Sequence, residues 1–129
     1  MTASVLDASA LLAMLRREPG GEKVAAILAD SAMTVVNLSE VVGHFARNGV
    51  AERDIRDVLE PLPVERVVFD EDLAYSAGLM IAVTRPAGLS FGDRACLALA
   101  RRSGRKAMTA DRTWLSVATL LGVEVELIR

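Results

Sequence analysis

The sequence LSFGDRACLALA, residues 89–100, predicts a nearly apolar helix that opens with one carboxylate, Asp93. Apolar residues at positions 95 and 97–100 leave almost no polar face, so we expect this helix to be buried against a sheet. Ser90 lies three residues before Asp93, which is the spacing of a capping box, where the acidic side chain accepts from the cap residue's N–H. Capping and a functional role are therefore both open for Asp93.

The composition indicates a small domain whose core is built from aliphatic side chains. The chain has 129 residues, which fits one domain over residues 1–129, and it is 52% hydrophobic but only 4% aromatic. The mean hydropathy of +0.33 suggests that a partner covers part of the apolar surface. The single cysteine, Cys96, excludes an internal disulfide and a cysteine-rich zinc site, and its apolar neighbours favour a core residue.

Charge and hydropathy exclude several classes of protein. A net charge of −2 argues against a general positive surface for nucleic acid, and pairs such as Arg101 and Arg102 are more simply solvated helix ends. No apolar run approaches the roughly 18 residues of a membrane span, and the N-terminus lacks the pattern of a signal peptide. We therefore expect a cytoplasmic protein.

Strand-like and helical segments alternate along the whole chain. Strands are expected at residues 4–6, 33–36, 64–69, 106–109 and 123–128, and helices at 10–15, 22–30, 37–48, 51–60, 71–83, 93–103 and 112–121. A parallel crossover needs a connection of helix length, so this alternation predicts an α/β fold with a mainly parallel sheet and helices on both faces.

Four carboxylates follow this pattern in a way that suggests a shared site. Asp7, Glu40 and Asp111 each follow an expected strand, and Asp93 opens a helix, so all four are expected at the carboxyl edge of the sheet. Carboxylates gathered there would repel each other by roughly 1 to 4 kcal/mol per close pair. A divalent cation removes that cost, and oxygen ligands without His or Cys suit Mg²⁺ or Mn²⁺.

Helix capping is the alternative for each of these residues. Asp7 and Asp111 have the positions of N-caps, and Glu40 has the spacing of a capping-box partner for Asn37, as Asp93 has for its own cap. Helix capping accounts for any one of these carboxylates, but it does not require that all four lie at one edge of the sheet.

Four segments carry a resemblance to a known family: VLDASAL at 5–11, NLSEV at 37–41, GLSFGDRA at 88–95 and TADR at 109–112. They resemble the four acidic motifs of PIN-domain ribonucleases, in order and spacing. The chain length and the run SFGDRACLALA are similar, more narrowly, to the VapC toxins of VapBC toxin–antitoxin modules.

The resemblance implies a three-layer α/β/α sandwich and an endonuclease that cleaves RNA with Mg²⁺ or Mn²⁺. Asp7, Glu40, Asp93 and Asp111 match the family's acidic metal-binding positions, with Asp7 and Asp93 our first choices for direct ligands. Ser9 and Thr109 match the small hydroxyl positions that support the acidic cluster. The family also implies a homodimer and a VapB-type antitoxin partner.

Three basic residues lie near these motifs. Arg94 and Arg112 each stand beside a site carboxylate and could contact a substrate phosphate, although a structural ion pair is an equal alternative. His44 lies one helical turn after Glu40, and we interpret it as an ordinary helix residue.

Two other functions stay open at this point. A receiver-like phosphoacceptor domain also gathers carboxylates around Mg²⁺. It resembles a scaffold with paired acids after the first strand and a lysine after the last strand. This chain has the single Asp7 after its first strand, and it ends at Arg129. A PIN scaffold without catalysis, which only binds a partner or RNA, is the second alternative.

Overall fold

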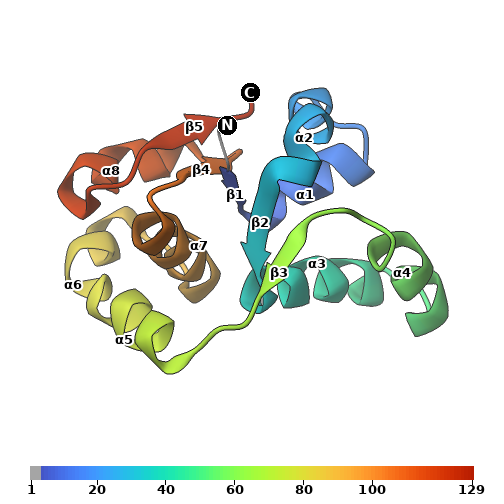
Figure 1. Ribbon diagram of the computed structural model, residues 1–129, viewed down its shortest axis with the longest axis horizontal. Coiled ribbons are helices and arrows are strands. Elements are labelled where there is room, and N and C mark those ends of the chain that lie inside the picture. The colour runs from blue at the N-terminus through green and yellow to red at the C-terminus, as the bar shows by residue number, and fades with distance from the viewer. Residues whose placement is uncertain (1–3) are drawn as a thin grey trace.

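The computed structural model describes residues 4–129, and in this part of the chain five parallel strands form one sheet. The strands are β1 (Ser4–Leu6), β2 (Ser31–Thr34), β3 (Glu65–Val67), β4 (Lys106–Thr109) and β5 (Val125–Leu127). Their order is β3-β2-β1-β4-β5, so the first strand lies at the centre (Figure 1). Its residue Ser4 pairs with Ser31 of β2 on one side and with Lys106 of β4 on the other.

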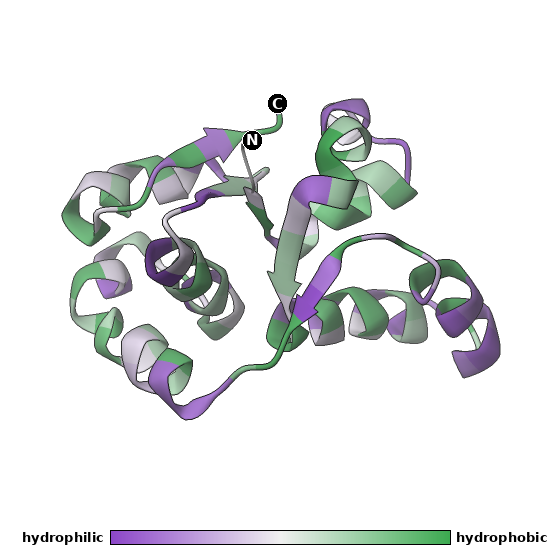
Figure 2. Ribbon diagram, in the orientation of Figure 1, coloured by the Kyte–Doolittle hydropathy of each residue, from purple (hydrophilic) through white to green (hydrophobic). Residues whose placement is uncertain are grey.

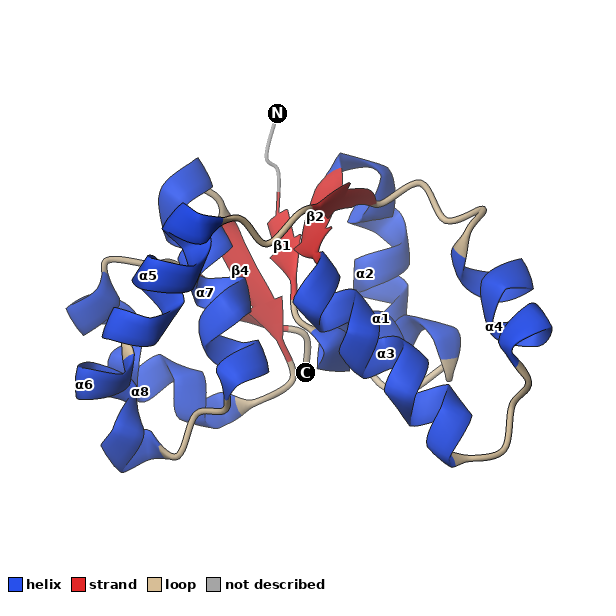
Figure 3. Ribbon diagram, turned by 90° about the horizontal axis from the view of Figure 1, so that it is seen from below, coloured by secondary structure: helices blue, strands red, loops and turns tan. Residues whose placement is uncertain are grey.

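Helices cover both faces of the sheet, as Figure 3 shows. One face packs against α1 (Ala8–Leu15), α2 (Gly21–Ile27), α3 (Val35–Arg47) and α4 (Glu52–Leu59), and the other against α5 (Glu71–Leu79), α6 (Ile81–Thr84), α7 (Phe91–Ser103) and α8 (Leu115–Leu121). Short 3-10 turns lie at Leu28–Asp30, Arg85–Ala87 and Arg112–Trp114. The expected α/β/α sandwich with a parallel sheet is confirmed.

The core is divided by the sheet into two apolar clusters. Consecutive residues of a strand point to opposite faces, so Val5 of β1 packs with the helices α5, α7 and α8, and Leu6 packs with α1 to α4. Helix α7 is buried from Ala95 to Ala100, as its apolar sequence predicts, and Cys96 lies fully within this core. Burial raises the pKa of the Cys96 thiol well above its usual value, which fits a structural and unreactive residue.

The boundary between β2 and α3 differs from the sequence prediction. Val35 and Val36 were expected to extend the strand because β-branched residues favour strands, but they form the first turn of α3. The hydroxyl of Thr34 accepts the N–H of Asn37 at 3.1 Å and therefore caps a helix that begins directly after it. The helix expected at 37–48 thus starts two residues earlier.

Three side chains expected to face inward are about half exposed: Val58, Ile81 and Leu115. Ile81 and Leu115 follow breaks in what the sequence suggested were continuous helices, since α5 ends at Leu79 and a 3-10 turn precedes α8. Each break rotates the next helix relative to the expected apolar face. Val58 lies on α4, which is hydrophilic along its outer side (Figure 2) and buries only Ile55 and Leu59.

Within residues 4–129, none of the helices has the length and apolar character needed to cross a bilayer. The expectation of one domain over residues 1–129 includes residues 1–3, which lie outside the described part of the chain, and it stays a prediction.

Candidate active site

Four acidic residues come from four elements that end or begin at the carboxyl edge of the sheet. Asp7 follows β1, Glu40 lies in the second turn of α3, Asp93 in the first turn of α7, and Asp111 follows β4. Asp7 is close enough to Asp93 and Glu40 for their charges to raise its pKa, and the charge of Asp111 likewise raises that of Asp93. The structure therefore brings Asp7, Glu40 and Asp93 together, with Asp111 beside Asp93.

Asp7 is the most buried of the four, with only 5% of its surface exposed. Ser9 Oγ donates to its Oδ2 at 2.7 Å, and Thr109 Oγ1 donates to the same oxygen at 2.9 Å. Asp7 occupies the N-cap position of α1, but its side chain makes no capping hydrogen bond. Capping therefore does not account for this carboxylate, and no described residue donates to its Oδ1.

Burial raises the pKa of Asp7 to about 6, and the negative charges of Asp93 and Glu40 add to that effect. The hydrogen bonds from Ser9 and Thr109 oppose it because they favour the ionised form. A buried carboxylate with a raised pKa beside two others is a common mark of a functional site.

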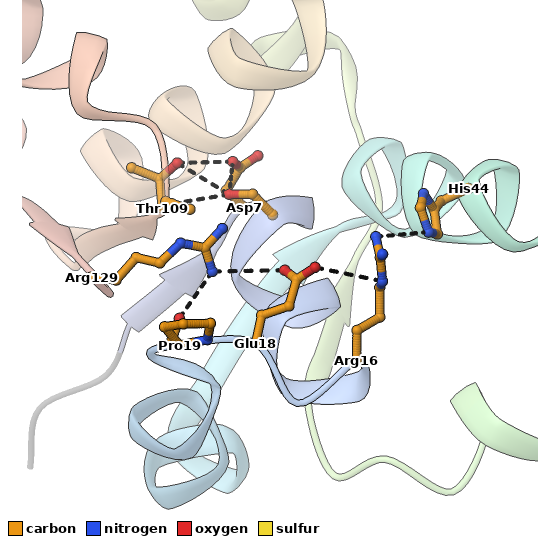
Figure 4. A network of polar contacts seen from close by, with 9 residues as sticks. Asp7, Arg16, Glu18, Pro19, His44, Thr109 and Arg129 are labelled. Carbon is orange, nitrogen blue, oxygen red and sulfur yellow. Dashed lines mark hydrogen bonds and ion pairs between the residues drawn. The ribbon is translucent and has the colours of Figure 1, made fainter.

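The two hydroxyls form a small network between α1 and the end of β4, part of which appears in Figure 4. Ser9 Oγ accepts the N–H of Ala110 at 3.0 Å, and Thr109 Oγ1 accepts the N–H of Asp111 at 3.0 Å. Ser9 and Thr109 thus hold Asp7 in place and also fix the backbone of the loop that carries Asp111.

Glu40 is held by Asn37 in a way that the sequence did not reveal. The side-chain amide of Asn37 donates to Glu40 Oε1 at 3.0 Å, whereas the capping-box reading required the backbone N–H of Asn37, which bonds to Thr34 instead. That capping-box reading is therefore wrong. Burial raises the pKa of Glu40, the bond from Asn37 opposes the rise, and the charge of Asp93 adds to it.

Asp93 forms the capping box that its spacing predicts. Its N–H donates to Ser90 Oγ at 3.2 Å, and the N–H of Ser90 donates to Asp93 Oδ2 at 2.8 Å. Burial still raises the pKa of Asp93, against the bonds from Ser90 and together with the charge of Asp111. Because Oδ1 has no donor among the described residues, the cap uses only half of this carboxylate.

Asp111 also acts as a cap. It is exposed, and its Oδ1 accepts the N–H of Thr113 at 2.9 Å and the Thr113 hydroxyl at 2.7 Å. Capping is thus confirmed for Asp93 and Asp111, whereas the Asp7 side chain makes no cap and the Asn37–Glu40 capping box is absent.

The chemistry of this donor set fits Mg²⁺ or Mn²⁺. The carboxylates offer hard oxygen atoms, several of them without a protein donor, and their mutual repulsion favours a cation between them. Among the described residues, however, no three acidic, His or Cys side chains are arranged to hold one ion. Asp93 and Asp111 are turned toward their caps, so an ion would have to draw these side chains inward.

The basic residues near the motifs make no hydrogen bond to a site carboxylate, although the positive charge of Arg94 lowers the pKa of Asp93. Arg94 Nη1 donates to the carbonyl of Ala77 on α5 at 3.3 Å, and its guanidinium lies 5.9 Å from the centre of the Phe91 ring. His44 contacts Arg16, the residue directly after α1, at 3.3 Å and not a site carboxylate (Figure 4). Arg112 is exposed next to Asp111, and no described residue bonds to its side chain.

A separate apolar groove of about 680 Å³ lies between α3 and α4. Its apolar lining consists of Leu38, Val42, Ala46, Val50, Ile55 and Leu59. Arg66 donates to the carbonyls of Leu59, Leu62 and Val64, which fixes the end of α4 beside the groove.

Comparison with known proteins identifies one family. The PIN domain family matches residues 4–120. No curated protein sequence matches the chain.

Several crystal structures are similar in fold. A chain in the DNA-bound VapBC from Salmonella typhimurium has a TM-score of 0.76 and 17% identity, with 100% of both chains covered. A chain in VapBC2 from Rickettsia felis, bound to a DNA fragment from their promoter, has a TM-score of 0.75, 12% identity and 98% coverage of both chains. A chain in VapBC-5 from Mycobacterium tuberculosis, a member of the VapBC family of toxin–antitoxin systems, has a TM-score of 0.62 and 24% identity, with 100% and 99% covered.

Proposed function

The chain belongs to the PIN domain family, and we propose that it is a Mg²⁺- or Mn²⁺-dependent endoribonuclease, the toxin of a type II toxin–antitoxin system. One observation carries the nuclease proposal. The Asp7 carboxylate is buried beside Glu40 and Asp93 with two hydroxyl donors and no cationic partner among the described residues. Such a cluster is costly without a cation, and PIN domains are generally nucleases.

Asp7 and Asp93 would hold the ion directly, and Glu40 and Asp111 would do so directly or through water. When bound, Mg²⁺ or Mn²⁺ supplies Lewis acidity, which generates a nucleophile from water near neutral pH and stabilises charge on the phosphoryl oxygens. Ser9 and Thr109 keep Asp7 oriented through their hydrogen bonds to Oδ2. Asp7 thereby needs little reorganisation before reaction.

The proposed substrate is RNA, whose phosphodiester would approach the exposed side of the acidic cluster. Arg112 is the better candidate of the two arginines for a phosphate contact because its side chain is exposed beside Asp111. Arg94 is already bonded to Ala77 and stacked near Phe91, which favours the structural alternative for it. An RNA substrate would place the activity in the cytoplasm.

We also propose a VapB-type antitoxin as protein partner and a homodimer as the toxin's own assembly. The groove between α3 and α4 supports the first, because an apolar channel rimmed by Glu52, Arg56 and Glu60 suits one face of an amphipathic helix. The three crystal structures of similar fold described above come from VapBC systems, and two of them are bound to DNA. Apolar side chains that stay exposed, such as Leu79 and Leu120, support the second proposal.

The strand order argues against the first alternative, the receiver-like domain. A receiver-like domain has the strand order 2-1-3-4-5, which differs from the order β3-β2-β1-β4-β5 of this chain. A PIN scaffold without catalysis is the second candidate. It is favoured by the two carboxylates that serve as caps, Asp93 and Asp111, and by the absence, among the described residues, of three side chains arranged to hold one ion.

The decisive experiment is incubation of the purified protein, free of antitoxin, with total RNA and Mn²⁺. Discrete fragments that vanish in EDTA and in the Asp7→Asn variant support the nuclease. Intact RNA with wild-type protein, under conditions where the protein binds Mn²⁺, favours the silent scaffold.

A further inference from the structure

Asn37 is a fully buried polar residue whose side chain links the two helices that carry Glu40 and Asp93. It has 0% exposed surface, and its Oδ1 accepts the hydroxyl of Thr34 at 2.8 Å. Its Nδ2 donates both to Glu40 Oε1 and to the carbonyl of Gly92, each at 3.0 Å. One amide group therefore joins the end of β2, the acidic residue of α3 and the first turn of α7.

An amide is the side chain that this place requires. It offers two N–H donors on one nitrogen, which serve a carboxylate and a main-chain carbonyl together, and an acceptor for Thr34. A hydroxyl has only one donor, and a carboxylate has none.

Gly92 complements Asn37 from the other side. A Cβ built on Gly92 would overlap the carboxylate of Glu40, so that carboxylate occupies the space that a side chain would fill. Gly92 is also the residue before Asp93, so a carboxylate seated on Gly92 lies at a fixed separation from Asp93.

We propose that Asn37 and Gly92 are positioning residues that seat the Glu40 carboxylate against α7 and thereby set its distance from Asp93. This inference rests on the proposed metal-dependent function, because its consequence is the affinity of the acidic cluster for a divalent cation. Hydrogen-bond partners of metal ligands typically change metal affinity or activity 10- to 100-fold when they are removed.

Gly92→Ala tests this without endangering the fold. The atoms that a new Cβ would meet belong to the far end of a flexible side chain, so Glu40 can swing away while the helix stays intact. Gly43→Ala is the matched control, because a Cβ at this position of α3 meets nothing within 4 Å. Asn37→Ala is the second variant, and Asn48→Ala is its control, since Asn48 donates to the carbonyl of His44 near the far end of α3.

The measurements are Mn²⁺ affinity by calorimetry on folded protein, and kcat and KM for RNA cleavage. Gly92→Ala and Asn37→Ala should each weaken Mn²⁺ binding about 10- to 100-fold, whereas Gly43→Ala and Asn48→Ala should leave it unchanged. Added to Glu40→Gln, neither variant should weaken binding further, because both act through Glu40. A merely structural role would lower the melting temperature without this dependence on Glu40.

Each of three results would overturn a different part of this proposal. Wild-type Mn²⁺ affinity in Gly92→Ala overturns the positioning role even if Asn37→Ala does not fold. An equal loss of affinity with and without Glu40→Gln overturns the action through Glu40. Absence of Mn²⁺ binding by the wild-type protein overturns the proposed function itself, and this inference with it.

Discussion

Thr109 Oγ1 donates a 2.9 Å hydrogen bond to Asp7 Oδ2, although 102 positions separate the two residues. The contact follows from the sheet, because β1 and β4 pair in parallel with Leu6 opposite Met108. Asp7 directly follows Leu6, and Thr109 directly follows Met108. The bond favours the ionised carboxylate, but burial is the larger effect and raises the pKa of Asp7 to about 6. At neutral pH, which is above this pKa, the buried Asp7 carboxylate is therefore ionised, and its burial destabilises the folded protein without metal.

The first prediction concerns the pH dependence of stability in EDTA. The folded pKa of Asp7, about 6, lies above its ordinary value of 3.8, so the folded state binds the proton more tightly. The contribution of Asp7 to the free energy of unfolding should fall by about 3 kcal/mol as pH rises from about 4 to about 6. It should be constant below and above that window.

Urea unfolding of the wild type and of Asp7→Asn across this range checks it. The difference between the two proteins is the useful quantity, because carboxylates such as Asp70, whose pKa the Leu73 N–H lowers, change stability in the opposite sense. Parallel curves for the two proteins would contradict the raised pKa of Asp7.

The second prediction is that Mg²⁺ or Mn²⁺ stabilises the folded protein by mass action. At about 100 times the dissociation constant, the gain should be roughly 2.7 kcal/mol. Melting temperature measured over a metal titration, with EDTA as the baseline, gives the result. The Asp7→Asn variant should show a much smaller rise, and a wild type that melts at one temperature throughout would speak against the metal site.

The third prediction separates ligands from caps. Glu40→Gln keeps an oxygen that can accept from Asn37 Nδ2, and Asp93→Asn keeps one that can accept from the Ser90 N–H. Stability without metal should therefore change by no more than a few tenths of a kcal/mol. RNA cleavage should fall by orders of magnitude, more severely in Asp93→Asn.

Asp70→Asn is the matched control for that pair, since Asp70 caps α5 and binds Arg102 outside the acidic cluster. It should cleave RNA at the wild-type rate. We would abandon the metal-nuclease proposal if Glu40→Gln and Asp93→Asn also cleaved at that rate with unchanged Mn²⁺ dependence.

The fourth prediction concerns the groove between α3 and α4. Val42→Glu places a charge among its apolar lining and should weaken binding of the cognate VapB-type antitoxin at least tenfold, about 1.4 kcal/mol. Ala25→Glu changes an exposed alanine of α2, outside the groove, and should leave the affinity unchanged. Calorimetry with purified antitoxin measures both, and equal affinities would remove the groove from the interface.

The fifth prediction is that the protein without antitoxin forms a dimer. Leu79 is 73% exposed, and several other apolar side chains stay uncovered in the isolated chain. Sedimentation equilibrium at micromolar concentration should give twice the mass of 13.8 kDa. A soluble monomer at high micromolar concentration would contradict the dimer.

Local patterns in the sequence were sufficient for most of the fold. The strand at Lys106–Thr109 was predicted with its observed ends, because the turn residues Ser103 and Gly104 precede it and Asp111 closely follows it. Val35 and Val36 were assigned to a strand because propensity favours one, whereas the Thr34 cap decides the helix start. The strand order was not predictable, since it depends on contacts between segments far apart in the chain.

Local patterns in the sequence also predicted part of the candidate site. Spacing alone placed Asp7, Glu40, Asp93 and Asp111 at one edge, but it could not tell which carboxylates cap helices, because that depends on side-chain rotation. Asn37 was misread for the same reason: the amide was expected to follow helix-cap geometry, yet it reaches across to Gly92 on another helix. An Asn directly after a strand-like segment and three residues before a site glutamate is the signal that could have identified it.

The central position of β1 has a consequence for synthesis on the ribosome. The chain emerges from its N-terminus, so β1 can pair with β2 long before β4 exists. A nascent chain at that stage lacks both Thr109, which holds Asp7, and Asp111, and it leaves one edge of its central strand open. The acidic cluster is therefore complete only near the end of translation, and a product truncated before α7 carries Asp7 and Glu40 without Asp93, Thr109 and Asp111.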